Sequence, residues 1–183
     1  MANTTKNIQS SKPVDFTPSN RYWAETHEIE NMPEALENYN LYEQDLALQG
    51  AIKINDGAWA ENDLSRFGEL CGTDEVIAWG AQANENKPVL HTHKRNGSRI
   101  DEVRFHPAYH QLMDLSMREG VHSSHWLEPK AGAHVARAAK SYLMAQVEAG
   151  HGCPITMTSA AIPTLKRQPD LYKEWSGKVM HQS

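Results

Sequence analysis

The sequence has little of what would take a protein to a membrane or cross-link it covalently. No apolar run approaches the roughly 18 residues that a membrane-spanning helix needs. The first residues are polar and lack the apolar centre of a secretion signal. We therefore expect a cytoplasmic protein that does not bind membranes. The 183 residues include only two cysteines, Cys71 and Cys153, without a Cys-x-x-Cys pair, which predicts reduced, buried thiols.

Short catalytic and cofactor motifs are also absent. The chain has no Gly-x-Ser-x-Gly, P-loop, Gly-x-Gly-x-x-Gly or His-Glu-x-x-His sequence. Some of its ten histidines have a spacing that could place two metal ligands together, so a metal site is an alternative. These pairs are His91 with His93, His106 with His110, and His122 with His125. Capping or polar packing explains His106 well, no cysteine pairs with these histidines at zinc-finger spacing, and we predict no metal site.

Positive charge is scarce in the first half of the chain. Residues 24–86 carry fourteen Asp or Glu and two Lys or Arg, a local charge of −12, whereas residues 87–183 carry +5. Binding to nucleic acid needs Lys and Arg clustered on one face. A hairpin could still gather four of them: Lys94, Arg95, Arg99 and Arg104. The other basic residues are scattered, so we expect no nucleic-acid contact through this segment.

Two further groups could carry chemistry. Cys153 follows a Gly-His-Gly turn just before an expected helix, whose dipole could activate a thiol. A small buried residue that fills the turn is the simpler interpretation. Asp101 and Glu102 could act as an acid and base pair, but the neighbouring Arg99 and Arg104 favour surface salt bridges instead.

The composition is that of an ordinary globular domain, with 39% hydrophobic and 22% charged residues. Residues 1–38 are predicted to be a flexible extension and an extended strap, anchored by Trp23 and Ile29. Residues 39–166 form the expected folded domain, and residues 167–183 read as a polar tail. Leu171, Tyr172 and Trp175 are possible docking points in that tail.

Apolar residues recur at helical spacing from residue 40 onward. Asn40 is a suitable N-cap and predicts a helix from Leu41 to an Asp-Gly pair. A second helix is expected over residues 62–71, and a third, capped by Thr73, ends before Pro88. The second helix has one apolar face, made of Leu64, Phe67, Gly68 and Cys71.

One β-hairpin is predicted between the helices. Residues 89–93 and 98–105 flank Asn96-Gly97, a pair that suits a type I′ turn because both positions tolerate positive φ. Such a two-stranded excursion must lean on the helices to be stable. Its expected apolar anchors are Ile100, Val103 and Phe105.

Helices return after the hairpin. His106 is the expected N-cap of a helix with Pro107 at its first position. A long Ala-rich helix follows over residues 132–149, and a last apolar helix over residues 154–165 is interrupted by Pro163. The fold class is therefore mainly α, with about five or six helices and one hairpin.

Three blocks form the most specific signal in the chain. They are DEVRFHPAYH at residues 101–110, VARAA at residues 135–139, and AQVEAGHGCPITMTSAA at residues 145–161. In this order they resemble the amino-terminal helical domain of AidB-like acyl-CoA dehydrogenases, and the resemblance runs from about residue 40 to residue 161.

The resemblance implies a protein of three parts: a helical domain, a small β domain and a carboxy-terminal helical bundle. In that family FAD lies between the last two parts, and a carboxylate of the bundle removes the α-proton of an acyl thioester. The resemblance also implies a homo-oligomer and a role in the response to DNA alkylation. DNA contacts in that branch are attributed to the carboxy-terminal part.

The present chain reaches Ser183, where the family would enter the β domain. The resemblance therefore carries over no catalytic or cofactor-binding residue, and we expect no tight FAD binding by this chain alone. The last helix of the family's first domain faces the flavin and acyl pocket, so the expected pocket-lining residues are Thr156, Met157 and Thr158.

The alternative function is a free-standing helical binding or scaffold module without catalysis. If later domains normally cover the last helix, apolar residues on it should be exposed in this chain, which would favour self-association. Those residues are Ile155, Met157, Ile162 and Leu165.

Overall fold

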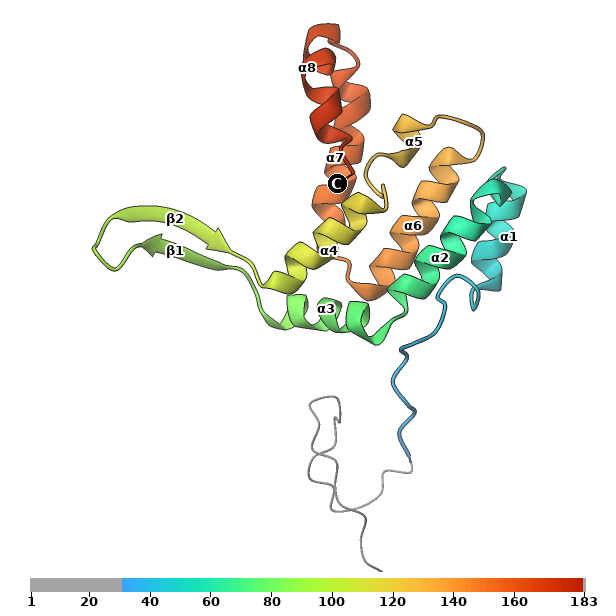
Figure 1. Cartoon of the computed structure of the whole chain (residues 1–183), viewed down its shortest axis with the longest axis horizontal. Coiled ribbons are helices and arrows are strands. Elements are labelled where there is room, and N and C mark those ends of the chain that lie inside the picture. The colour runs from blue at the N-terminus through green and yellow to red at the C-terminus, as the bar shows by residue number, and fades with distance from the viewer. Residues whose placement is uncertain (1–30, 183) are drawn as a thin grey trace, which may run out of the picture. The chain divides into compact units, whose positions relative to one another are not determined.

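The computed structural model describes residues 31–182, so most of the predicted extension and strap, with Trp23 and Ile29, lies outside the described residues. Residues 36–182 belong to one helical unit, shown in Figure 1. Its first half contains α1 (Leu46–Ile54), the 3-10 helix η1 (Ala58–Ala60), α2 (Glu61–Cys71) and α3 (Asp74–Glu85), then strands β1 (Val89–His93) and β2 (Arg99–Arg104). Its second half contains α4 (Pro107–Arg118), α5 (Ser124–Leu127), α6 (Ala133–Val147), α7 (Gly152–Leu165) and α8 (Pro169–Val179).

The mainly α class with one hairpin is confirmed, with eight α-helices in the described residues instead of five or six. Two predicted caps are also confirmed. The Thr73 hydroxyl accepts a hydrogen bond from the Val76 amide at 3.3 Å and begins α3. His106 Nδ1 accepts from the Ala108 amide at 3.2 Å and begins α4, with Pro107 at the first helical position.

The predicted start of the first helix at Leu41 is wrong. Asn40 does cap, but its Oδ1 accepts from the Tyr42 and Glu43 amides and closes only a turn. The helix begins at Leu46, because the Asp45 carboxylate accepts from the Leu48 amide at 2.8 Å. Two good caps five residues apart compete for one helix start, and the second one is used.

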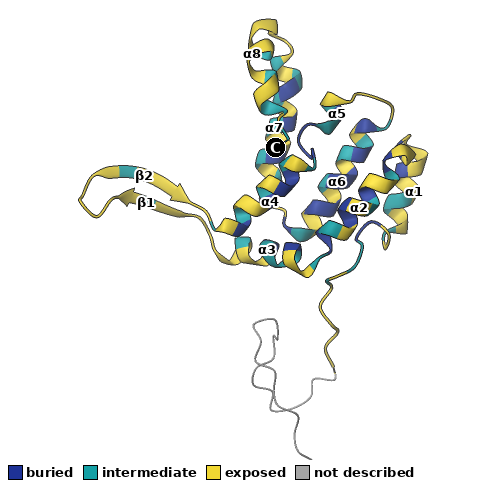
Figure 2. Cartoon of the chain, viewed as in Figure 1, coloured by how far each residue is buried: buried dark blue, intermediate teal, exposed yellow. Residues whose placement is uncertain are grey.

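The core lies among α2, α3, α4 and α6, whose buried sides appear dark blue in Figure 2. The predicted apolar face of α2 is confirmed as buried. Fully buried large side chains of the core are Ile52 of α1, Leu64 and Phe67 of α2, Leu112 of α4 and Leu143 of α6. Each contributes roughly 1.5–3 kcal/mol by leaving water. Gly80 lets α3 approach the end of α6, since an added Cβ would collide with the Val147 carbonyl.

The hairpin extends away from the helices (Figure 1), so the expectation that it leans on them is wrong. Val103 is 51% exposed. Phe105 reaches the helices at α4, where it stacks on Tyr109 with ring centroids 4.3 Å apart and meets the edge of His110. The turn also differs from type I′. Among Asn96 and Gly97 only Gly97 has positive φ, +83°, and its amide donates to the Lys94 carbonyl. This is a type I turn followed by a left-handed glycine.

Pro163 lies inside α7 without ending it. A proline cannot donate to the carbonyl four residues earlier, here that of Ser159. The indole Nε1 of Trp126 donates to this carbonyl at 3.0 Å and replaces the missing bond. The helix therefore continues to Leu165. No helix in residues 31–182 is long and apolar enough to cross a membrane.

The predicted polar tail contains α8, which lies beside α7 (Figure 1). Packing of α7 on α4, α6 and α8 buries Ile155 and Ile162, at 3% and 0% exposure. The expectation that these two residues are exposed is therefore wrong. The expectation of exposure is correct for Met157, which is 68% exposed, whereas Leu165 is half-buried.

Candidate functional site

A hollow of about 260 Å³ opens between α4, α6 and the amino-terminal end of α7. Its open surface is mainly apolar with a few polar groups, the usual character of a small-molecule site. The apolar lining comes from Val121, Met144, Ala145, Ala149 and Ile155. The polar lining comes from Ser116, Ser141, Glu148, His151 and Thr156.

A chain of three buried polar side chains borders this hollow. The Ser116 hydroxyl lies 2.9 Å from His151 Nε2, and His151 Nδ1 lies 2.8 Å from a Glu148 carboxylate oxygen. Ser116 comes from α4, whereas Glu148 and His151 belong to the turn between α6 and α7. Their exposed fractions are 0%, 8% and 1% for Ser116, Glu148 and His151.

The carboxylate of Glu148 is the negatively charged member of these three hydrogen-bonded side chains. Burial alone would raise its pKa, but hydrogen bonds from the His151 amide and ring, and from the Gly150 amide, lower it overall. The two amide nitrogens lie 2.8 and 2.6 Å from the carboxylate. Because an ionised carboxylate only accepts, His151 Nδ1 carries a proton, and in the neutral ring Nε2 accepts from Ser116.

The order serine, histidine, carboxylate is that of an activated nucleophile. Ser116 has no exposed surface, however, so no substrate reaches its hydroxyl in this structure. The same carboxylate holds two backbone amides of the turn. The arrangement therefore acts as a clamp that joins the start of α7 to α4, and it gives the hollow one polar edge.

The predicted pocket-lining residues separate in the structure. Thr156 lines the hollow. Met157 is exposed to solvent and does not line it. The Thr158 hydroxyl donates to the Pro154 carbonyl at 2.8 Å, within its own helix. Only Thr156 thus shares a surface with the clamp.

Other sequence candidates can also be placed. Cys71 is buried as expected, but Cys153 is exposed, so its predicted burial is wrong. The turn is filled by the Glu148 side chain rather than by the cysteine. The predicted salt bridges on the hairpin are confirmed, with Arg99 paired to Asp101 at 2.7 Å and Arg104 paired to Glu102 at 3.1 Å.

The histidine pairs do not converge on a common point. His106 is a helix cap, His122 Nε2 lies 2.9 Å from the His181 carbonyl, and His125 Nε2 lies 3.1 Å from the Ser159 hydroxyl. Burial lowers the pKa of His125 to about 4, helped by nearby positive groups. Within residues 31–182, no three His, Cys, Asp or Glu side chains are grouped to hold a metal ion.

Sequence reasoning missed the clamp. Ser116 stands next to Leu115 on the buried side of α4, and a serine among apolar residues is a sign of a buried partner. Glu148 and His151 are three residues apart, as in many local side-chain pairs. Neither signal shows that the two segments meet.

Solved structures identify the class of fold. ACDH-11 of Caenorhabditis elegans in complex with C11-CoA aligns with a TM-score of 0.72 and 22% identity, covering 91% of this chain and 30% of that one. The apo form of Bd2924 aligns with a TM-score of 0.74 and 22% identity, covering 84% and 32%. The fold is that of the helical amino-terminal domain of acyl-CoA dehydrogenases.

The chain belongs to the family of the Adaptive response protein AidB N-terminal domain, whose family model matches residues 31–183. It is 43% identical over 161 residues to AidB of Escherichia coli strain K12, covering 87% of this chain and 30% of that protein. It is 33% identical over 106 residues to acyl-CoA dehydrogenase family member 11 of Caenorhabditis elegans, covering 56% and 17%. The chain thus spans less than a third of the length of these relatives, and the resemblance noted in the sequence is confirmed.

Proposed function

We propose that this chain is the amino-terminal helical domain of a flavin-dependent, acyl-CoA dehydrogenase-like oxidoreductase of the AidB branch. In this role it supplies part of the wall of an acyl pocket and no catalytic group. Thr156, Met157 and Thr158 on α7 are the proposed lining residues. The other domains of the relatives are the proposed partners, in a homo-oligomer that acts in the response to DNA alkylation.

The exposed face of α7 is the observation that supports this role. The helix has no charged residue from Gly152 to Leu165, and Met157 leaves 68% of its surface in solvent. Beside Thr156 this uncharged face continues into the apolar hollow. An alkyl chain or an apolar domain surface would gain free energy by covering it. A structural relative has been solved with C11-CoA.

The start of α7, beside the hollow, does not fit the pyrophosphate of FAD by itself. A flavin pyrophosphate needs free backbone amides at a helix start or clustered cations. At the start of α7, the Gly150 and His151 amides already bind the Glu148 carboxylate, and the Gly152 and Cys153 amides donate to carbonyls. No redox step is therefore assigned to this chain.

A free-standing helical binding or scaffold module is the second candidate. The burial of Ile155 and Ile162 favours it, because α7 already has its main apolar partners within this chain. The two candidates differ in what covers Met157 and Thr156. A pocket wall is covered by acyl chain or by later domains, whereas a scaffold module needs neither.

A chimera in which this chain replaces the matching part of Escherichia coli AidB tests the proposal. We expect the chimera to bind FAD and acyl-CoA. Met157→Glu or Thr156→Trp should weaken acyl-CoA binding about tenfold or more, because a tenfold change is equivalent to the loss of one buried apolar contact. Leu46→Glu is the matched control, since Leu46 is 78% exposed on α1. Unchanged acyl-CoA affinity in all three variants, with FAD retained, would refute the wall and favour the scaffold module.

A further inference from the structure

A second and more polar pocket, of about 340 Å³, lies on the side of α6 that faces α2 and α5. Its walls combine apolar groups with an unusual number of charged ones. The apolar lining includes Trp59, Ala60, Leu64, Leu127, Ala133 and Ala136. The charged lining is Asp63, Arg66, Arg118, Glu119, Glu128, Arg137 and Lys140.

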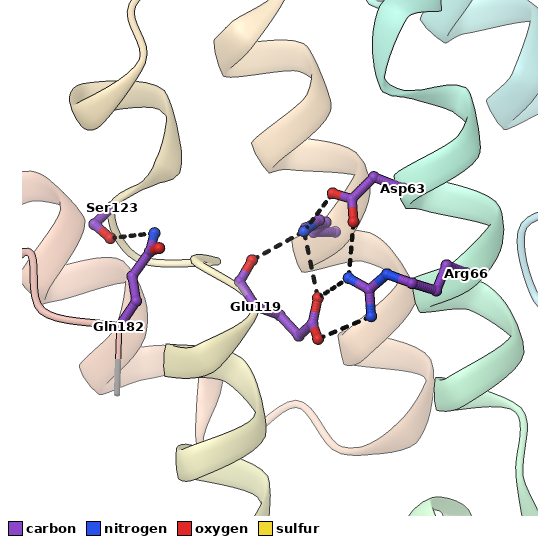
Figure 3. Close-up of polar contacts among 6 residues, drawn as sticks. Asp63, Arg66, Glu119, Ser123 and Gln182 are labelled. Atoms are coloured by element: carbon purple, nitrogen blue, oxygen red, sulfur yellow. Dashed lines mark hydrogen bonds and ion pairs between the residues drawn. The ribbon is translucent and has the colours of Figure 1, made fainter.

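Most of these charges are balanced within the pocket wall. Figure 3 shows Arg66 of α2 paired both with Asp63 on the same helix and with Glu119 at the end of α4. The Lys140 amine from α6 lies 2.7 Å from an Asp63 carboxylate oxygen and 3.6 Å from one of Glu119, and it donates to the Glu119 carbonyl. Two cations thus face two carboxylates, and this network has no charge left for a ligand.

Two further charged residues of the wall also have partners. Arg118 is paired with Asp114 at 2.9 Å, and Glu128 lies 3.7 Å from the Lys130 amine. Arg137 differs from both. Of the charged groups that line this pocket in the described part of the chain, it alone has no side chain of opposite charge in contact.

The Arg137 guanidinium is also incompletely hydrogen-bonded. Its Nε donates to the Val121 carbonyl at 2.8 Å, which fixes the plane of the group. Its Nη2 is buried and has no acceptor among the described residues. Loss of water lowers the pKa of Arg137, with no carboxylate to oppose that effect. A buried N–H group without an acceptor is costly, so this corner of the pocket favours a ligand that accepts a hydrogen bond from Nη2.

The neighbouring aromatic rings do not supply an anion for Arg137. Burial is the main cause that lowers the pKa values of His122 and His125, and the positive charge of the nearby Arg137 lowers them further. An imidazole carries no negative charge at neutral pH, so neither ring can serve as the anion. The missing partner must therefore come from outside the described residues.

We propose that this pocket binds the carboxylate of a small monocarboxylic acid, held by the outer nitrogens of Arg137. A guanidinium held at Nε presents the rest of its planar fork to two carboxylate oxygens. A dianion would bring more charge than Arg137 alone can balance, since Asp63, Glu119 and Glu128 already pair with other cations. The apolar wall at Trp59 accommodates a short alkyl tail.

Titration of the 183-residue chain with butyrate tests the proposal, followed by ¹H–¹⁵N NMR of the Arg137 Nε–H and Trp59 indole N–H signals. We expect saturable shifts with butyrate. The uncharged isostere butyramide should bind at least about tenfold more weakly, because the charge-assisted hydrogen bonds are lost. Inorganic phosphate, largely dianionic at pH 7.5, should also bind more weakly than butyrate.

Arg137→Gln should abolish saturation by butyrate, and Arg137→Lys should weaken it by keeping the charge without the fork. Arg118→Gln is the matched control in the same pocket and should leave the affinity unchanged, since Arg118 is already paired. Equal binding of butyrate and butyramide to the unmodified chain would overturn the proposal without any variant. Tighter binding of phosphate would overturn the assignment to a monocarboxylate, and absence of saturation by any probe would remove the site.

Discussion

The clamp at the start of α7 makes a quantitative prediction for Glu148→Ala. The change removes the acceptor of two backbone amides, those of Gly150 and His151, and of the His151 ring. Gly150 is exposed, so water can replace its bond. The two His151 donors are buried, and each unsatisfied buried donor costs about 1–3 kcal/mol. We therefore expect a loss of roughly 2–6 kcal/mol from a total of about 5–15 kcal/mol.

Urea unfolding followed by far-ultraviolet circular dichroism measures this loss as a lower midpoint with an unchanged slope. Glu69→Ala is the matched control, because Glu69 is exposed on α2, and it should change the free energy of unfolding by less than about 0.5 kcal/mol. If Glu148→Ala and Glu69→Ala have the same small effect, the clamp does not stabilise the start of α7 and the reasoning fails.

The clamp also predicts a dependence on pH. The pKa of Glu148 is lower in the folded chain than its ordinary value of 4.5. Its contribution to stability is therefore present above about pH 4.5 and is lost as pH falls through the folded pKa. Between pH 7 and pH 3, the Glu148→Ala variant should lose less stability than the unmodified chain. An identical loss in both would contradict this assignment.

Three further predictions concern groups away from the clamp. His125 has a pKa of about 4 in the folded chain against an ordinary 6.5, so an NMR titration should find it neutral from pH 5 to 8. Its low pKa should also reduce the free energy of unfolding as pH falls below 6.5. An ordinary titration curve would show that the ring is not buried. Titration with FAD at micromolar concentration should give no stoichiometric yellow protein, since the amides at the start of α7 are occupied. Gel-shift assays at moderate salt should show no sub-micromolar DNA binding, because Arg99 and Arg104 are paired and leave only Lys94 and Arg95 at the hairpin tip; tight binding lost when these four become Ala would contradict it.

Local features of the sequence predicted the elements that depend on local interactions. Thr73 and His106 cap their helices because a side chain reaches a backbone amide two or three residues away. The apolar face of α2 follows from helical spacing alone. The ion pairs of the hairpin join residues two apart. The family blocks are linear sequence, so the resemblance could be found without any coordinates.

Other features depend on residues that are far apart in the chain. Helix α7 passes through Pro163 because Trp126, from another helix, supplies the missing donor. Ile155 is buried and Cys153 exposed according to which side of α7 meets α4 and α6. The helix in the predicted polar tail exists because it packs along α7, which periodicity of a polar segment does not reveal.

Both candidate sites belong to this second group. Ser116 lies 35 residues from His151, and their contact exists only because α4 packs against α7. The VARAA block contains Arg137, but only the packing of α6 against α2 and α5 shows that its Nη2 is buried. The same packing shows that Arg137 lies beside paired charges without a carboxylate of its own. The sequence by itself determined most of the helices, the hairpin and the family, since these rest on local patterns. Tertiary structure decided which polar side chains meet and which cation stays unpaired, because burial and partner distance are properties of packing.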